Sequence, residues 1–355
     1  MDIEFNLINP EQRKQKPDNI STVQFGTTFT DHMLTMRYRN GSWHSPQIVP
    51  YQPLSIDPAA LVLHYGQGIF EGLKAYRRGT DVFLFRPDNN FERLNNSARR
   101  MVMPEIDPKL SLNLLKELLK VECEWIPDSL GTSLYIRPTM IATEPKLGVR
   151  PSEEYLFYII LSPVGPYFKE GFGPISIMIA EQHVRAAEGG VGVAKTMGNY
   201  AASLMAGTKS RDLGYSQVLW LDASHRKYLE EVGTMNIFVV FDDEVATPIL
   251  GGTILPGITR DSVMKLAEHW GMQITERNID VAEVIDGIKT GKVKEIFGCG
   301  TAAVIAPIGH LHYQNERHTV NSGSVGPLSQ RLYDTLTRLQ CGESDDPFNW
   351  VIKVS

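Results

Sequence analysis

A glycine- and proline-rich passage at residues 165–174 is the feature that most constrains how this chain folds. It separates two apolar runs, 155–163 and 175–180, which have the composition of buried strands. The chain has 355 residues, which is more than one ordinary hydrophobic core supports. We therefore predict two domains that meet at this passage.

The predicted N-terminal domain covers residues 1–163, the linker 164–174 and the C-terminal domain 175–355. Residues 1–20 are polar and are expected to form an extended arm. Alternating or β-branched runs predict strands, and apolar residues at helical spacing predict helices. The expected strands are 25–38, 82–85, 133–141, 216–222, 235–241, 274–277 and 294–297. The expected helices are 88–101, 111–123, 200–213, 260–270, 281–290 and 327–339. This mixture predicts an α/β (α+β) protein.

The charge balance argues against a nucleic-acid partner. The formal net charge is −6 and the sequence pI is about 5.9, so a phosphate backbone would be repelled. The N-terminal sequence MDIEFNLINP lacks the basic and apolar regions of a targeting peptide, and no apolar run reaches membrane-spanning length. We expect a cytoplasmic protein without a membrane or nucleic-acid partner.

Cysteine and histidine spacing predicts neither a disulfide framework nor a metal site. Cys123, Cys299 and Cys341 are widely spaced and odd in number, which fits a reducing compartment. His32 and His64 flank apolar segments without a second ligand at metal spacing. We therefore expect structural histidines and no bound metal.

Two strings of residues predict a cofactor site. The string GGVGVAKTMGNY, residues 189–200, places Lys195 among small residues, with Tyr200 five positions later. The string EEVGTMN, residues 230–236, puts Glu231 into an otherwise apolar segment. A partly deprotonated lysine can attack an aldehyde, and a pyridine ring held in this way needs a negative partner at its nitrogen. A lone lysine in a loop is more often a solvated surface residue, so the prediction needs further support.

Two glycine-containing turns supply that support, because each offers N–H groups to an anion. Residues 256–261, PGITRD, precede an amphipathic helical pattern whose first N–H groups favour a phosphate. Residues 298–303, GCGTAA, end a strand in a turn that also carries a threonine hydroxyl. Most turns of this kind hold no anion. Two of them, together with Lys195 and Glu231, predict a cofactor that carries a phosphate.

Two arginines are further candidates for anion binding. Arg86 stands between a predicted strand and a predicted helix, where its guanidinium can bind an anion, although a strand-end salt bridge is an equal alternative. Arg137 lies within the apolar strand that contains YIRP, where a charge should be paired or functional.

Together these strings resemble the branched-chain amino acid aminotransferases, which are class IV aminotransferases and fold-type IV pyridoxal-phosphate enzymes. The resemblance covers nearly the whole chain. It rests on FGTTFTDHM from Phe25, YGQGIFEGLKAY from Tyr65, FRPDNNFERL from Phe85, YIRP from Tyr135, AKTMGNY from Ala194, EEVGTMN from Glu230, LPGITR from Leu255 and FGCGTAAVIAP from Phe297. It implies a smaller N-terminal α+β domain, a larger C-terminal pseudo-barrel domain and a homodimer.

The resemblance also implies the reaction and the residues that perform it. Lys195 would carry pyridoxal 5'-phosphate and move the proton, Tyr200 would bond the ring hydroxyl and Glu231 would pair with the ring nitrogen. The implied phosphate ligands are Arg86, Ile258, Thr259 and Thr301. The implied substrate residues are Phe70, Tyr135, Arg137, Tyr167, Thr234, Thr301 and Ala302, and Lys74 of EGLKAY would be structural. The implied activity is reversible ping-pong transamination of leucine, isoleucine and valine with 2-oxoglutarate, giving branched 2-oxo acids and glutamate.

Three alternatives are weighed against this reading. D-amino acid aminotransferases and aminodeoxychorismate lyases share the lysine and glutamate strings, but YIRP and YGQGIFEGLKAY argue against both. A non-catalytic binding module of the same fold is the third, although Lys195 and Glu231 are intact. The chain departs from mammalian members in one respect. They carry a CxxC pair where this chain has Ala303 and Ala306, so no thiol switch of that kind is expected.

Overall fold

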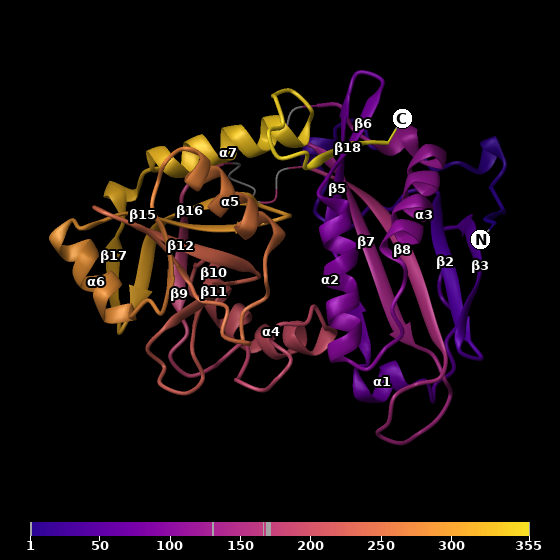
Figure 1. The fold of residues 1–355 in the computed structure, drawn as a ribbon, viewed down its shortest axis with the longest axis horizontal. Helices are drawn as coiled ribbons and strands as arrows, with labels where there is room; N and C mark the ends of the chain where they lie inside the picture. Colours follow the sequence, from indigo (N-terminus) through magenta and orange to yellow (C-terminus); the bar gives the residue numbers. More distant parts are fainter. Residues whose placement is uncertain (1, 130, 166, 168–171, 355) are drawn as a thin grey trace. The chain divides into compact units, whose positions relative to one another are not determined.

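The structure, a computed structural model, describes residues 2–129, 131–165, 167 and 172–354. Its contacts group the chain into two compact units, which we describe separately (Figure 1). The first comprises Met1–Tyr167, Ala194–Met197 and Arg338–Ser355, and the second comprises Phe168–Val193 and Gly198–Thr337. The segment around Lys195 and the C-terminal tail thus extend the first unit beyond the predicted N-terminal domain. The predicted domain boundaries stay a prediction, because compact units need not coincide with domains.

The first unit is built on a nine-stranded sheet with the order β1-β3-β2-β8-β7-β5-β6-β18, in which β4 pairs with β7. Every pairing is antiparallel except that of β1 with β3. Its strands are β1 Glu4–Phe5, β2 His32–Arg39, β3 Ser42–Pro50, β4 Gly68–Phe70, β5 Leu73–Arg78, β6 Asp81–Phe85, β7 Ser133–Ala142, β8 Tyr155–Val164 and β18 Val351–Lys353.

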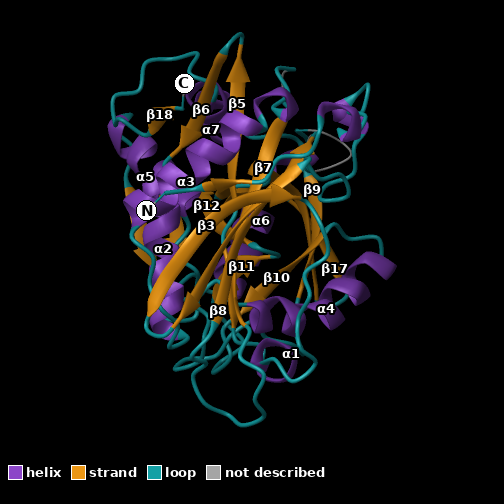
Figure 2. Ribbon diagram, turned by 90° about the vertical axis from the view of Figure 1, so that its right-hand side faces the viewer, coloured by secondary structure: helices purple, strands orange, loops and turns teal. Residues whose placement is uncertain are grey.

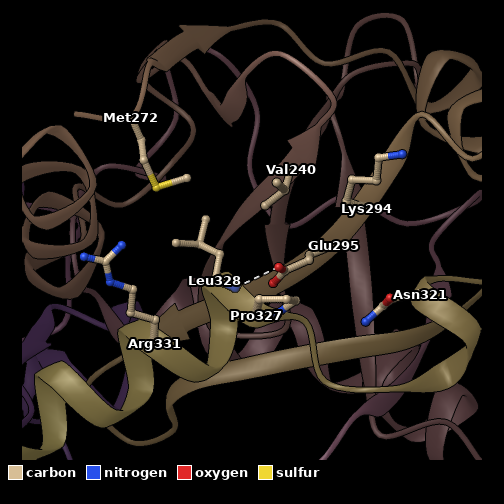
Figure 3. Close-up of a pocket in the computed structure, with 8 residues that line it drawn as sticks. All are labelled: Val240, Met272, Lys294, Glu295, Asn321, Pro327, Leu328 and Arg331. Atoms are coloured by element: carbon tan, nitrogen blue, oxygen red, sulfur yellow. Dashed lines mark hydrogen bonds between the residues drawn. The ribbon is translucent and has the colours of Figure 1, made fainter. Parts of the chain in front are cut away.

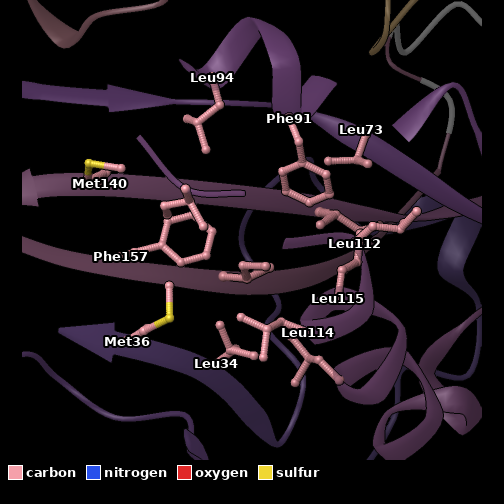
Figure 4. Close-up of a cluster of buried hydrophobic side chains, with 14 of the residues drawn as sticks. Leu34, Met36, Leu73, Phe91, Leu94, Leu112, Leu114, Leu115, Met140 and Phe157 are labelled. Atoms are coloured by element: carbon pink, nitrogen blue, oxygen red, sulfur yellow. The ribbon is translucent and has the colours of Figure 1, made fainter. Parts of the chain in front are cut away.

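Two helices, α2 Pro87–Arg100 and α3 Pro108–Val121, pack against this sheet (Figure 1). The predicted apolar face of α3 is confirmed, because Leu114, Leu115, Leu118 and Leu119 are all buried. Figure 4 shows leucines of α3 and Phe91 and Leu94 of α2 meeting residues of β2, β5, β7 and β8. The short helix α1 Leu61–Tyr65 and the 3-10 turns η1 Pro10–Gln12, η2 Ile20–Thr22 and η3 Cys123–Trp125 complete the unit.

The second unit contains a closed ring of six strands. The pairing order is β11-β10-β9-β16-β15-β12, and β12 pairs back onto β11, so the sheet closes as the predicted pseudo-barrel requires. β13, β14 and β17 extend the sheet outside the ring. The strands, orange in Figure 2, are β9 Ile175–Ile179, β10 Gln217–Leu221, β11 Leu229–Val232, β12 Met235–Phe241, β13 Val245–Pro248, β14 Ile274–Arg277, β15 Val293–Gly300, β16 Val304–Tyr313 and β17 Glu316–Thr319.

The helices of the second unit begin and end close to the predicted positions. They are α4 Met197–Asp212, α5 Ile258–His269, α6 Val281–Thr290 and α7 Pro327–Gln340, with the 3-10 turn η4 Asn321–Gly323. α5 and α6 pack on β15, and Phe238 of β12 stacks on Phe297 of β15 with ring centroids 5.2 Å apart. Both rings are fully buried, so this pair packs β12 against β15 in the interior of the second unit.

The predicted strand at 25–38 begins later than expected, because β2 starts at His32. Residues 25–31 instead contain a turn at Gly26, whose φ of 71° is left-handed, and Phe25 packs on other aromatic rings. The sequence reasoning also missed several strands, among them β3, β5 and β16.

Candidate active site

Glu231 lies on β11 in the barrel wall, and its charge is compensated on several sides. Leu255 donates its backbone N–H to Oε1 at 3.1 Å, and Asn236 donates its side-chain N–H to the same oxygen at 3.4 Å. Arg185 Nε lies 2.5 Å from Oε2, although its N–H does not point at the oxygen with hydrogen-bond geometry. Both side chains are almost completely buried. A buried carboxylate with this support stays available as a fixed negative charge.

Asn236 connects Glu231 to the first predicted phosphate turn. It lies opposite Glu231 in the β11–β12 pair and also donates to the Leu255 carbonyl at 3.0 Å. Gly257 caps the N-terminus of α5, and a Cβ at this position would lie 1.9 Å from Asn236 Oδ1. Glycine is therefore required at position 257. The start of α5 packs directly against Asn236, which donates a hydrogen bond to Glu231. The N–H groups of Ile258 and Thr259 belong to the first turn of α5, which has no intrahelical acceptors.

The second predicted turn lies at the same corner of the barrel. Asn236 pairs with Cys299 in the β12–β15 register, and β15 ends at Gly300. Thr301 and Ala302 then form the turn into β16, as the sequence predicts. Thr234 lies in the tight turn between β11 and β12. The second unit therefore gathers Glu231, the start of α5 and the 301–302 turn. Tyr200 belongs to the same unit and lies in the first turns of α4, half-buried.

Lys195 is held by the first unit through its backbone. Its N–H donates to Ser97 Oγ at 2.8 Å, and its carbonyl accepts the N–H of Phe70 at 3.0 Å. Its neighbour Thr196 bridges to Ile69. The ammonium group of Lys195 lies 5.0 Å from the centre of the Phe70 ring. The loop around Lys195 is therefore attached to β4 by one isolated bridge and one backbone hydrogen bond.

Arg137 stands among aromatic rings. Its guanidinium carbon lies 4.7 Å from the Phe70 ring centre and 5.2 Å from that of Tyr135, and Nη2 donates to the Tyr135 hydroxyl at 3.0 Å. Nε is buried without a hydrogen-bond partner. Within the described part of the chain Arg137 pairs with no carboxylate. Among the described residues of the first unit, the Arg137 charge meets aromatic rings and tyrosine hydroxyls. The sequence prediction that this charge is paired or functional therefore remains a prediction of function.

Gly72 makes room for this arrangement. A Cβ at Gly72 would lie 2.1 Å from the Tyr135 hydroxyl oxygen, so the EGLKAY string needs its glycine to admit the ring. Phe25, which sequence reasoning did not place in the site, packs edge-on against Tyr135 at 4.8 Å and against Tyr167 at 5.7 Å between ring centroids. Its position in FGTTFTDHM was the only signal that could have revealed it.

Arg86 is buried at the N-cap of α2, with a left-handed backbone (φ 50°). Its guanidinium lies over the Trp350 ring at 5.0 Å, and Nε donates to Asn89 Oδ1 at 3.2 Å. These contacts turn it back toward the C-terminal tail of the first unit.

The structure also describes the surroundings of His32, His64 and Lys74, for which the sequence predicts structural roles. His32 accepts the N–H of Ile8 at Nε2 and lies 2.5 Å from Glu122 at Nδ1, and His64 bonds the Pro58 carbonyl. Lys74 is buried in β5, and burial lowers its pKa to about 8. No group of three or more potential metal ligands occurs in the part of the chain that the structure describes. No helix there is long and apolar enough to cross a membrane.

A cavity of about 550 Å³ in the second unit contains none of the predicted site residues (Figure 3). It is lined by Val240, Met272, Lys294, Glu295, Asn321, Pro327, Leu328 and Arg331. Its buried carboxylate, Glu295, accepts N–H bonds from Leu328 at 2.8 Å and Ser329 at 2.9 Å, and also the Ser329 hydroxyl at 2.8 Å. Glu295 therefore caps α7 and serves the fold.

Comparison with known proteins identifies the class. The family described as Amino-transferase class IV matches residues 68–311, and the chain belongs to this family. Among its curated relatives, branched-chain-amino-acid aminotransferase 2 of Bacillus subtilis (strain 168) is 52% identical over 97% of this chain and 95% of its own length. Branched-chain-amino-acid transaminase 1 of the same strain is 51% identical over 96% of each chain. The solved branched-chain amino acid aminotransferase of Escherichia coli superposes with a TM-score of 0.77 at 26% identity, covering 92% of this chain and 99% of its own.

Proposed function

We propose that this chain is a branched-chain-amino-acid aminotransferase that uses pyridoxal 5'-phosphate. It transfers the amino group of leucine, isoleucine or valine to 2-oxoglutarate, in a reversible ping-pong reaction that yields branched 2-oxo acids and glutamate. The curated relatives that are about half identical over almost the whole chain carry this name. The observation that carries the proposal is Glu231, a buried carboxylate held at the same corner of the barrel as the two turns that we predict to bind a phosphate.

The donor set at this corner fits the cofactor. Bound pyridoxal phosphate supplies an aldehyde carbon and an electron-withdrawing ring when its nitrogen is protonated. Glu231 would keep that proton on the ring, because its negative charge is fixed by Leu255 and Asn236. Arg86, the N–H groups of Ile258 and Thr259, and Thr301 would bind the phosphate. Tyr200 would bond the ring hydroxyl.

Lys195 would hold the aldehyde carbon in the resting enzyme. Once the substrate amine has replaced it there, the freed Lys195 amine would move the proton at the substrate α-carbon. Its backbone bonds to Ser97 and Phe70 fix where its side chain begins. Thr301 and Ala302 of the β15–β16 turn and Thr234 of the β11–β12 turn would receive the substrate α-carboxylate. Phe70, Tyr135 and Tyr167 would contact the branched side chain.

Arg137 would receive the second carboxylate of glutamate or 2-oxoglutarate. Its support is the setting described above, in which a guanidinium lies against two rings and a hydroxyl. An arginine held in this way can bind a carboxylate through two N–H groups, while its planar face remains compatible with an apolar side chain. One pocket could thereby accept both leucine and glutamate.

We also propose that the enzyme is a cytoplasmic homodimer. The support for association is the surface of α4, which exposes Leu204 and Met205 at 64% and 69%. The support for the compartment is the set of three free, scattered cysteines. Sedimentation of the purified protein measures the first proposal, and a monomer at micromolar concentration would reject it.

A substrate panel with purified, cofactor-loaded protein tests the function. We expect turnover with L-leucine, L-isoleucine and L-valine in the presence of 2-oxoglutarate. Preference for D-alanine would indicate a D-amino acid aminotransferase, and pyruvate release from aminodeoxychorismate would indicate the lyase. Borohydride reduction followed by peptide mass spectrometry should place a pyridoxyl group on Lys195, and Lys195→Ala should fold without it. Protein that takes up no cofactor and turns over no substrate would fit only the binding module.

A further inference from the structure

The backbone of Lys195 is fixed from two directions. Phe70 of β4 bonds its carbonyl, and Ser97 of α2 accepts its N–H at 2.8 Å. Thr196 continues the attachment, because its hydroxyl donates to the Gly68 carbonyl at 2.8 Å. At Lys195 itself, the bond to β4 joins two main-chain groups, the Phe70 N–H and the Lys195 carbonyl. The helix side depends on one hydroxyl, that of Ser97.

Ser97 belongs to a buried polar stripe along α2. Asn90, Arg93 and Ser97 are spaced three and four residues apart, so they lie on one face of the helix. All three are buried, which is unusual for such residues unless each has a partner. The stripe ends at Ser97, whose side chain has no exposed surface.

The partners of this stripe are Glu71 and Lys195. The Glu71 carboxylate is fully buried and accepts bonds from Arg93 Nε at 2.8 Å, Arg93 Nη2 at 2.9 Å and Asn90 at 2.8 Å. Two residues of the stripe therefore hold the residue that follows Phe70, and the third holds Lys195. Side chains of α2 are therefore hydrogen-bonded both to Glu71, in the segment that contains Phe70, and to the backbone of Lys195.

We propose that Ser97 is a positioning residue for the catalytic lysine, an inference that rests on the proposed function of Lys195. The hydroxyl acts through the backbone and fixes the Cα from which the amine reaches. With the main chain held, only the side-chain torsions of Lys195 change while it moves a proton. A small displacement of a reacting group lowers the rate far more than it lowers binding. Ser97 therefore supports the rate of proton transfer, with little effect on substrate affinity.

Ser97→Ala tests this inference, with Ser111→Ala as the matched control. Ser111 is a buried serine on α3 of the same unit, and its hydroxyl has no hydrogen-bond partner. In the cofactor-free protein, hydrogen exchange of the peptide containing residues 194–197 should rise at least about tenfold in Ser97→Ala and stay unchanged in Ser111→Ala. Ser97→Thr keeps the hydroxyl and should restore protection. Thermal melts of all three variants establish that each is folded.

In the loaded enzyme, the single-turnover rate with leucine should fall by about 10- to 100-fold in Ser97→Ala, while the half-saturating leucine concentration changes less than about threefold. Unchanged exchange and rate in Ser97→Ala, or equal losses in Ser111→Ala, would overturn the inference. The borohydride adduct separates the two proposals. If wild-type Lys195 carries no pyridoxyl group, the proposed function fails, whereas the exchange measurement still reports whether Ser97 anchors the lysine backbone.

Discussion

Arg185 and Glu231 form an ion pair inside the second unit, with 2.5 Å between Nε and Oε2 and both side chains at most 8% exposed. Arg185 also donates to the carbonyl groups of Gly192 and Thr253, so its position is fixed independently of Glu231. A buried pair of this kind contributes little net stability while intact, but loss of one partner leaves the other charge buried.

Arg185→Gln should therefore destabilise the protein by about 2–4 kcal/mol, since Leu255 and Asn236 still compensate part of the Glu231 charge. Urea unfolding of the cofactor-free protein measures this change. Adding Glu231→Gln should recover about 1–3 kcal/mol, because the double variant no longer buries a single charge. Strictly additive losses would show that the two residues do not interact.

Gly72→Ala should disturb the substrate region of the first unit. The new methyl group would overlap the Tyr135 hydroxyl and break its bond with Arg137. We expect a loss of about 1–3 kcal/mol in stability and a raised KM for both leucine and 2-oxoglutarate. Gly251→Ala is the control, because a Cβ there meets nothing within 4 Å. Normal kinetics in Gly72→Ala would place Tyr135 outside the substrate site.

Lys74 predicts a pH dependence of stability. Burial lowers its pKa from 10.5 to about 8 in the folded protein, so the unfolded chain binds this proton more tightly. The free energy of unfolding should therefore rise between pH 8 and pH 10.5, by about 3 kcal/mol for this residue alone. Lys74→Met should remove this rise, and the difference between wild type and variant cancels the titration of other groups. Urea unfolding at pH 7.5 and pH 10 tests it, and parallel curves would contradict it.

Cys299 should be almost inert to alkylation. Burial raises the pKa of its thiol to about 12, whereas the thiolate is the reactive form. At pH 8 the native protein should label at Cys299 at least about 100-fold more slowly than the same protein in urea. The half-buried Cys123 serves as an internal reference in mass spectrometry. Mild oxidants should accordingly leave activity intact, and a loss reversed by dithiothreitol would argue otherwise.

Helices and strands with a regular apolar pattern were predictable, because the residues that repeat in the sequence are the ones that pack into the core. The leucines of α3 repeat at helical spacing and face one sheet, and the apolar run at 235–241 forms β12 with the expected bounds. β16 was missed because Pro307 and Gly309 interrupt its pattern. Its pairing with β15, β9 and β17 maintains the strand nonetheless. Such long-range partners leave no local trace in the sequence.

In the candidate site, too, residues in local motifs were predictable, whereas residues defined by long-range contacts were not. Lys195 and Glu231 stand in distinctive strings, so the sequence was sufficient to select them. Arg185 lies 46 residues before Glu231 in a polar loop, and only the folded chain shows that their charges meet. Ser97 and Phe25 were equally hidden, because their contacts join segments far apart in the chain.

The strand β18 makes the sheet of the first unit depend on a long-range contact. β18 closes the edge of the sheet beside β6, and the Trp350 carbonyl accepts the N–H of Arg86 at 2.7 Å. Trp350 lies more than 260 residues after Arg86 in the sequence, so this edge of the sheet is complete only when two distant parts of the chain have met. The backbone partner of Arg86, a proposed phosphate ligand, is therefore supplied by a segment that no local pattern around Arg86 could specify.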